Sequence, residues 1–193
     1  MKKTLYDLTK DEWNTLFPIE LSNHNSDWRS IFKSEKKRIL KNIDARFINK
    51  IEHFGSTSIP NIKAKNYIDL FIEIPKESLF NKQLIEEFTK LGYVYFEVPA
   101  REDIEAYMSF GKGYNLEGEK EQIFHIHMCP KENTMYNQLK FRDYLIENPN
   151  RAKEYEKLKV ELASKYKNDR GSYVLGKTNF VKETLNLYAK TIK

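Results

Sequence analysis

A glycine-serine turn followed by an isolated aspartate is the part of this sequence best suited to chemistry. Both features lie in the stretch IEHFGSTSIPNIKAKNYIDLFIEI, residues 51–74. Gly55 permits backbone geometry that a Cβ would obstruct, while Ser56 and Thr57 supply hydroxyl and N–H groups that can hold a phosphate. The turn is therefore a candidate binding site for the phosphates of a nucleotide or of another phosphorylated small molecule.

The aspartate lies in an apolar run whose period-2 spacing predicts a β-strand. One face carries the aliphatic residues Ile68, Leu70, Ile72 and Ile74, and the other carries Asp69, Phe71 and Glu73. A carboxylate inside such a run is unfavourable unless something pairs with it. A divalent cation that bridges to phosphate oxygens is one candidate partner. The structural alternative is a nearby N–H, Lys63 or Lys65.

Two histidines, His125 and His127, form a second candidate group. Residues i and i+2 of a strand project from one face with Cα atoms roughly 6.6 Å apart, so both rings can converge on one ion or one phosphate. Neutral imidazoles suit manganese or zinc better than magnesium. The structural alternative is that one histidine bonds a backbone carbonyl while the other pairs with Asp69 or Glu52.

Taken in order, these motifs resemble the signature of the GrpB family, which is assigned to the nucleotidyltransferase superfamily. The resemblance extends from about residue 28 to residue 188, and an ordered set of motifs over this length is more specific than any one of them. Asn61 and Asn66 stand where the family usually has glycine and proline. The matching residues are Glu52-His53-Phe54-Gly55-Ser56-Thr57-Ser58-Ile59-Pro60, Lys65, Ile68-Asp69, Phe124-His125-Ile126-His127, Leu139-Lys140-Phe141-Arg142-Asp143-Tyr144-Leu145, Pro149, Tyr155, Lys159, Tyr173 and Lys177.

The resemblance implies an enzyme that binds a nucleoside triphosphate with a divalent metal and transfers a nucleotidyl group to an unknown acceptor hydroxyl. The expected metal is magnesium or manganese, with zinc as the third choice. Asp69, His125 and His127 would form the catalytic and metal-binding group, in which a histidine could also act as a general base. The expected phosphate-binding residues are Gly55, Ser56, Thr57, Lys65 and Arg142.

Arg142 is included because a guanidinium can hold a phosphate bidentately. It follows the histidine strand and lies with Asp143 at the predicted start of a helix, where an aspartate complements the helix dipole. A structural salt bridge is the alternative for Arg142. Lys177 is a further candidate for phosphate contact.

Phe71 is the main departure from the chemistry that the resemblance implies. Active nucleotidyltransferases typically carry a second carboxylate two residues after the strand aspartate, and that position here is Phe71. Glu73 is a poor substitute, because four residues of strand separate it from Asp69 by roughly 13 Å. Two alternatives therefore stay open: a catalytically inactive nucleotide- or anion-binding module of the same fold, and a scaffold that binds another protein. The sequence leaves open whether the protein is an enzyme.

Composition sets the wider limits. The 193 residues, of which 40% are hydrophobic and 32% charged, predict one folded domain over residues 1–193. We find no apolar run near the roughly 20 residues that span a bilayer and no signal-peptide core, so we expect a cytoplasmic protein without a membrane partner. A single cysteine, Cys129, excludes an internal disulfide. The net charge is +5, but the lysines are interleaved with glutamates and we find no nucleic-acid-binding motif. The oligomeric state stays open.

The elements that must position these residues predict an α+β fold. It comprises a nucleotidyltransferase-like mixed β-sheet with packed helices and a helical C-terminal half. A long helix with Ser26 or Asp27 as its N-cap is expected before the site. The expected helices are residues 28–47, 77–91 (ending at Gly92), 136–147, 151–166 and 177–192, with a break at Pro149. Besides the two strands of the turn, the expected strands are residues 93–98, 106–114 and 123–128, the last two flanking a turn at Gly118.

Overall fold

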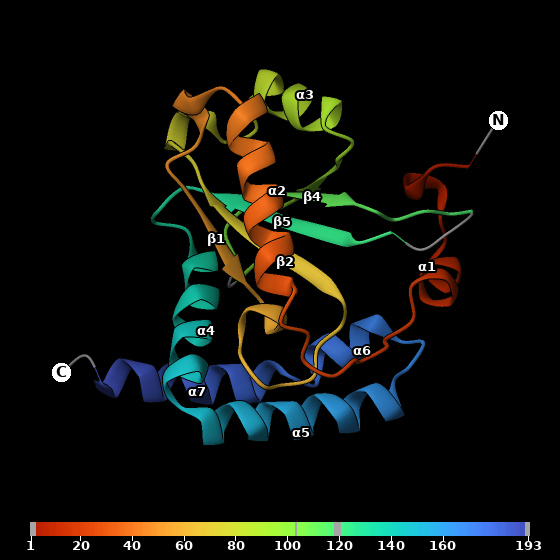
Figure 1. Ribbon diagram of the computed structural model, residues 1–193, viewed down its shortest axis with the longest axis vertical. Helices are drawn as coiled ribbons and strands as arrows, with labels where there is room; N and C mark the ends of the chain where they lie inside the picture. Colours follow the sequence, from red (N-terminus) through yellow and green to blue (C-terminus); the bar gives the residue numbers. More distant parts are fainter. Residues whose placement is uncertain (1–2, 103, 118–120, 192–193) are drawn as a thin grey trace.

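A five-stranded mixed sheet forms the centre of the protein (Figure 1). The computed structural model describes residues 3–102, 104–117 and 121–191. In sheet order the strands are β1 (Lys50–Phe54), β2 (Tyr67–Glu73), β5 (Ile123–Cys129), β4 (Tyr107–Lys112) and β3 (Val94–Val98). β2 and β5 run parallel, and the other neighbouring strands run antiparallel. This mixed sheet with packed helices confirms the predicted α+β class.

The strand register brings the predicted functional residues onto one face of the sheet. Asp69 pairs with Phe54 of β1 and with His125 of β5, and Phe71 lies beside His127 in the next row. Residues that are directly opposite in neighbouring strands point to the same face. Residues from β2 and β5 that are 56 positions apart in sequence therefore meet at the centre of the sheet.

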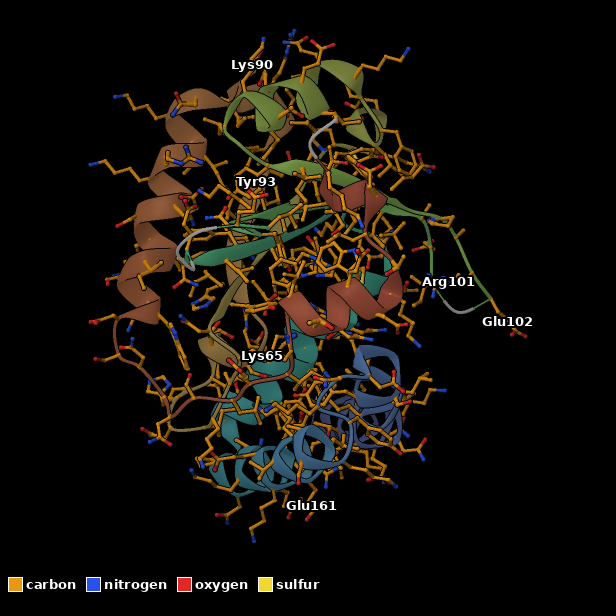
Figure 2. All side chains as sticks on the ribbon, turned by 90° about the vertical axis from the view of Figure 1, so that its right-hand side faces the viewer. Lys65, Lys90, Tyr93, Arg101, Glu102 and Glu161 are labelled. Carbon is orange, nitrogen blue, oxygen red and sulfur yellow. The ribbon has the colours of Figure 1, made fainter. Side chains whose placement is uncertain are left out.

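Helices after the sheet make up the C-terminal part of the fold. They are α4 (Asn137–Glu147), α5 (Pro149–Lys165), α6 (Arg170–Leu175) and α7 (Thr178–Thr191). In Figure 1, α5 and α7 run beneath the sheet, and Figure 2 shows Lys65 between the sheet and these helices. Ile59 and Ile62, from the loop after Gly55, are buried together with Leu145 of α4 and Tyr155 of α5. The C-terminal helices thus pack directly on the loop that carries the predicted turn.

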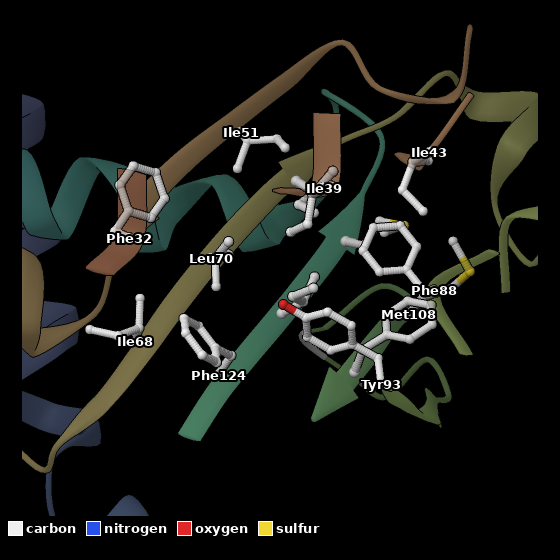
Figure 3. Packing of buried hydrophobic residues seen from close by; sticks show 14 of the residues in the cluster. Phe32, Ile39, Ile43, Ile51, Ile68, Leu70, Phe88, Tyr93, Met108 and Phe124 are labelled. Atoms are coloured by element: carbon white, nitrogen blue, oxygen red, sulfur yellow. The ribbon is translucent and has the colours of Figure 1, made fainter. Parts of the chain in front are cut away.

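The opposite face of the sheet packs against α2 (Trp28–Asn42) and α3 (Lys82–Lys90). Figure 3 shows Ile68, Leu70 and Phe124 of the sheet in this layer with Ile39 of α2 and Phe88 of α3. All of them except Phe124, which is 8% exposed, are fully buried. The predicted alternation is confirmed, because the aliphatic residues of β2 face this core and Asp69 faces away from it.

The helix predicted to run through residue 47 ends earlier, at Asn42. Ile43 has extended backbone geometry, and the Asp44 side chain accepts a hydrogen bond from the Arg46 N–H that begins a short 3₁₀ turn. Phe47 still reaches the core, but Leu40 is 50% exposed. The apolar spacing continued past the true end of the helix because the turn buries Phe47 by a different geometry.

Other element boundaries also differ from the predictions. The helix expected from residue 77 begins at residue 82, because Asn81 caps it by accepting a hydrogen bond from the Leu84 N–H. Pro149 is the first residue of α5, a position where its missing N–H costs nothing. Two short helices, α1 (Lys10–Leu16) and α6, were not predicted.

The turn predicted at Gly118 and the last predicted helical residue, Ile192, lie outside the described residues. In the part of the chain that is described, we find no helix with the length and apolar character needed to cross a membrane.

Candidate functional site

The turn at Gly55 is shaped around the carboxylate of Asp69. Gly55 has φ 68° and ψ −175°, a combination that residues with a side chain rarely adopt. A Cβ at this position would lie 2.1 Å from Oδ2 of Asp69. The glycine therefore allows the turn and the aspartate to be in contact, which joins the two features that the sequence singled out.

Asp69, His125 and His127 form a cluster with the geometry of a metal site. Each offers one ligand atom, and these atoms all lie within 4.8 Å of one another. Nδ1 of His125 is 3.7 Å from Oδ1 of Asp69, and the two imidazole rings have centroids 4.6 Å apart. The side chains of Asp69 and His125 are 23% and 27% exposed, so a ligand can reach them from solvent. The closeness of His125 to Asp69 also fits the structural alternative of a simple ion pair.

His127 gives an independent indication that a ligand belongs here. Its ring packs between Phe54 and Tyr107, with centroids 5.2 and 5.4 Å away, and its Nδ1 is buried with no hydrogen-bond partner. A buried polar atom without a partner is unfavourable. Burial lowers the pKa of His127 to about 3, so the ring is neutral at physiological pH. A neutral imidazole with an unpaired nitrogen fits a divalent cation.

The Asp69 carboxylate is ionised in this environment. Burial alone would raise its pKa, but the hydrogen bond and charge of His125 outweigh burial and hold the pKa below its usual value. His127 and Lys65 contribute in the same direction. An ionised carboxylate beside two imidazoles is a suitable ligand set for manganese or zinc.

The neighbouring positions supply no second carboxylate of the expected kind. Phe71 is fully buried and packs against Phe54 and Tyr136, with ring centroids 6.0 and 4.9 Å away. Glu73 accepts hydrogen bonds from the Tyr136 hydroxyl and from Asn49. Phe71 thus joins an apolar cluster on the same face as Asp69.

The hydroxyls after Gly55 serve different purposes. The Thr57 side chain is buried, and its hydroxyl donates to the Tyr67 carbonyl at 2.9 Å and pairs with Nε2 of His53 at 3.0 Å. The Ser56 side chain is partly exposed and hydrogen-bonds the Tyr155 hydroxyl. Thr57 is therefore engaged in holding the loop, while Ser56 keeps the more accessible position for a phosphate.

Arg142 makes its contacts with residues outside the predicted phosphate-binding turn. Its Nη1 is 2.6 Å from Glu52 and donates to the His53 carbonyl at 2.7 Å, and its Nε donates to Asp143 at 2.7 Å. The prediction that Arg142 and Asp143 begin a helix is wrong, because both lie in the middle of α4. These contacts match the structural alternative for Arg142, which is a salt bridge that holds α4 against β1.

Lys65 belongs to a group of cations supplied mainly by the C-terminal helices. Arg170 begins α6, Lys177 follows it, and Lys159 lies on α5. Burial, followed by the charge of Arg170, lowers the pKa of Lys65 to about 7. Burial also lowers the pKa of Lys177 to about 8, although Asp69 opposes this shift. The charge of Asp69 acts on both lysines.

The role of Arg170 was missed, because it belongs to no recognised motif. A usable signal did exist for two of its neighbours. Tyr155 and Lys159, like Tyr173 and Lys177, are four residues apart. In each pair the ammonium lies over the ring, at 4.9 and 4.5 Å from the centroid. A repeated Tyr-x-x-x-Lys spacing that begins on a helix therefore predicts cation–π pairs that fix lysine positions.

Comparisons with known proteins agree with this architecture. The sequence model of a family described as GrpB protein matches residues 18–187. Glutamate-rich protein GrpB of Alkalihalophilus pseudofirmus is 36% identical over 170 residues, which cover 87% of this chain and 94% of that protein. UPF0157 protein YqkA of Bacillus subtilis is 36% identical over 165 residues, covering 85% of this chain but 45% of the relative. The chain thus spans less than half the length of YqkA.

A solved structure shows the same fold. The crystal structure of conserved protein GrpB from Enterococcus faecalis superposes with a TM-score of 0.72 at 27% sequence identity. The match covers 90% of this chain and 99% of that one.

Proposed function

The chain belongs to the GrpB family, and from this premise we propose that it is a metal-dependent nucleotidyltransferase-like enzyme. Its substrate would be a nucleoside triphosphate, and its product a nucleotidyl group joined to an acceptor hydroxyl. The observation that carries the proposal is the contact between the Gly55 turn and a three-residue metal-ligand cluster on β2 and β5. A phosphate-binding turn and a metal site in contact are what a metal-bound nucleotide requires.

The residues divide the proposed work between them. Asp69, His125 and His127 would hold one divalent cation. When bound, this cation would neutralise charge on the phosphate that is transferred. Gly55 and Ser56 would bind phosphate oxygens through the turn. Lys65 would add positive charge on the side of the C-terminal helices.

The proposed reaction is a displacement at the α-phosphorus. The acceptor hydroxyl oxygen forms a bond to that phosphorus, the bond to the β-phosphate bridging oxygen breaks, and pyrophosphate leaves. The hydroxyl proton passes to a base, for which His125, whose side chain is 27% exposed, is a candidate only in a state where it does not bind the ion.

The ligand set favours manganese or zinc over magnesium. Two of the three donors are imidazoles, which suit transition metals, whereas magnesium prefers oxygen ligands. Phe71 occupies the position of a second carboxylate, so we infer that one ion is bound by protein side chains. Two-metal catalysis by protein ligands alone would need a further carboxylate.

Thermal unfolding with each nucleoside triphosphate and magnesium, manganese or zinc provides the first test. A ligand that binds only the folded state at 100 times its dissociation constant stabilises it by about 2.7 kcal/mol. We expect a metal-dependent rise in melting temperature for the native protein and none for Asp69→Asn. The matched control is Asp27→Asn, an exposed position whose side chain makes no capping hydrogen bond.

Pyrophosphate release in the presence of candidate acceptors then separates an enzyme from a binding module. Metal-dependent release that Asp69→Asn abolishes and Asp27→Asn retains is the expected result. Saturable nucleotide binding without release would leave a catalytically inactive nucleotide-binding module. If no nucleotide raises the melting temperature of a cooperatively folded protein, the transferase proposal fails.

A further inference from the structure

Four cationic side chains from separate elements lie near one another, because the charges of the other three all act on Lys65. They are Lys65 in the loop before β2, Lys159 on α5, Arg170 on α6 and Lys177 between α6 and α7. None of the ion pairs among residues 3–102, 104–117 and 121–191 includes any of these four. The opposite charge that acts on both Lys65 and Lys177 is the single carboxylate of Asp69.

Aromatic rings hold these cations in position without neutralising them. The Lys65 ammonium lies 4.4 Å from the centroid of Tyr67, and the Arg170 guanidinium lies 5.6 Å from the same ring. Arg170 also interacts with the hydroxyls of Tyr67 and Tyr114. The Lys177 ammonium is 4.5 Å from the Tyr173 centroid. A cation–π contact fixes a cation without supplying an opposite full charge.

This arrangement is unfavourable in the ligand-free protein. Like charges near one another in a half-buried setting repel, and each loses part of its hydration. Lys65, Arg170 and Lys177 are all partly exposed, so an anion can reach them. Lys159 is 1% exposed and donates to the Lys63 carbonyl, so its contribution is through its charge. The surplus of positive charge indicates a ligand with several negative charges.

We propose that Lys65, Arg170 and Lys177 form a binding site for a linear polyphosphate of at least two phosphate groups, next to the metal cluster of Asp69. Arg170 would contact one phosphate bidentately, and the two lysines would act as point charges on the neighbouring groups. Three cations carry more positive charge than a single phosphate can balance, so a ligand with at least two phosphate groups matches the site better.

For the identity of its natural ligand this inference rests on the proposed function. In a nucleoside triphosphate the bound groups would be the β- and γ-phosphates, which depart together as pyrophosphate. Arg170 and Lys177 would then hold the leaving group, while the α-phosphate lies toward Asp69. The C-terminal helices would complete a site whose turn and metal ligands come from the sheet.

Isothermal titration calorimetry with inorganic tripolyphosphate, without metal and with a chelator, tests the site directly. The comparison ligands are pyrophosphate, orthophosphate and sulfate at physiological ionic strength. We expect tripolyphosphate to bind at least about tenfold more tightly than orthophosphate, because it makes additional charge-assisted contacts with the cations. Equal affinities for all four anions would overturn the proposal.

Substitutions identify the residues responsible. Lys177→Gln and Arg170→Gln should each weaken tripolyphosphate binding by about tenfold or more. Lys182→Gln is the matched control, because Lys182 is an exposed lysine of α7 outside the cluster. Arg170→Lys is included in case Arg170→Gln fails to fold. It keeps the charge but loses the bidentate fork, so it should show an intermediate loss of tripolyphosphate affinity. Equal binding by Lys177→Gln and Lys182→Gln would refute the assignment.

The outcomes separate this inference from the proposed function. Tripolyphosphate binding that depends on Lys177 and Arg170, in a protein that releases no pyrophosphate from any nucleotide, would uphold the polyphosphate site and reject nucleotidyl transfer. Pyrophosphate release that Lys177→Gln and Arg170→Gln leave unchanged would uphold the transferase and reject this site. Nucleoside triphosphates that bind much more tightly than tripolyphosphate would identify a nucleotide, and not inorganic polyphosphate, as the ligand.

Discussion

Two clusters of charged residues lie on opposite faces of the sheet, and they are built in opposite ways. On the α2 side, Glu35 is 6% exposed and accepts hydrogen bonds from Lys112, from the Tyr93 hydroxyl at 2.7 Å and from Arg38. Burial would raise the Glu35 pKa, but these bonds outweigh burial and lower it. Each cation of this cluster contacts the carboxylate, so its charges are paired.

In the cluster on the other face of the sheet, the cations are not paired with carboxylates of the residues that the structure describes. Tyrosine rings hold Lys65, Lys159, Arg170 and Lys177, and Asp69 acts on Lys65 and Lys177. Lys112 also lies over aromatic rings, yet it contacts Glu35 as well. The difference teaches that aromatic contacts alone do not distinguish a structural cluster from a binding site. Direct pairing with a carboxylate does: Arg38 and Lys112 both contact Glu35, whereas the cations on the other face make no such contact among the described residues.

Removing the central carboxylate of the paired cluster should have the largest effect. Glu35→Gln leaves Lys112 and Arg38 without their anion, and breaking a buried ion pair from one side costs about 3–5 kcal/mol. Urea denaturation measures this loss in the free energy of unfolding. Glu86→Gln, an exposed position on α3, is the control and should change it by less than about 0.5 kcal/mol. A loss below about 1 kcal/mol for Glu35→Gln would break the comparison.

Gly55→Ala tests the unpaired cluster through its backbone. The positive φ costs about 1–3 kcal/mol for a residue with a side chain, and the new Cβ would also displace the Asp69 carboxylate. We expect a loss of about 2 kcal/mol in unfolding free energy together with loss of manganese binding, measured by titration. Gly92→Ala is a close control, because Gly92 has φ 81° and no heavy atom within 4 Å of its added Cβ. It should lose stability but keep metal binding.

The unpaired lysines predict a characteristic pH dependence. Burial lowers the pKa of Lys65 and Lys159 to about 7 and that of Lys177 to about 8, below the usual value of 10.5. Between these values the unfolded chain binds more protons than the folded protein, so stability rises with pH. We expect the unfolding free energy to increase by at least about 2 kcal/mol between pH 7 and 9.5, because each pKa unit by which one lysine is lowered contributes about 1.4 kcal/mol.

The variant Lys159→Met should flatten this increase, whereas Lys157→Met, an exposed position on the same helix, should leave it unchanged. Chemical denaturation at several pH values provides the measurement. A free energy of unfolding that falls steadily from pH 7 to 9.5 would contradict the assignment of unmatched lysines. Lys112 of the Glu35 cluster adds to this slope in the same direction, because burial lowers its pKa although Glu35 opposes the shift.

The substitution with the smallest expected effect on stability gives the clearest contrast between the two clusters. Lys177→Gln removes one of the unmatched cations, so at pH 7 the unfolding free energy should stay the same or rise by up to about 1 kcal/mol. Lys182→Gln, the exposed control on α7, should fall within about 0.5 kcal/mol of the native value. Destabilisation by Lys177→Gln of the size expected for Glu35→Gln would mean that both clusters are structural.

Much of the site was predictable because its parts lie on strands with simple periodicity. The two-residue alternation placed Asp69 opposite the aliphatic core face, and the same alternation placed His125 and His127 together. What periodicity could not predict was which strands pair, because a strand pattern does not specify its neighbour. The parallel pairing of β2 with β5 sets Asp69 beside His125, and it depends on the packing of the whole sheet.

The helix boundaries were less predictable for a local reason. Apolar spacing carried the first long helix past residue 42, where Asp44 side-chain bonding favours a 3₁₀ turn. Arg142 was expected near a phosphate, but the packing of α4 against β1 brings its guanidinium to Glu52. In both cases the deciding contact was a polar interaction that leaves little trace in a hydrophobic pattern.

By itself, the sequence determined the α+β class, the family, and the residue types of the candidate metal site, because periodicity and short motifs depend only on neighbours along the chain. Only the tertiary structure decided that Arg170 and Lys177 lie near Lys65. Arg170 lies on α6 and Lys177 in the turn after it, both more than 100 positions after Lys65. Which charges are paired depends on the side chains that folding brings together, so it can be judged only from the tertiary structure.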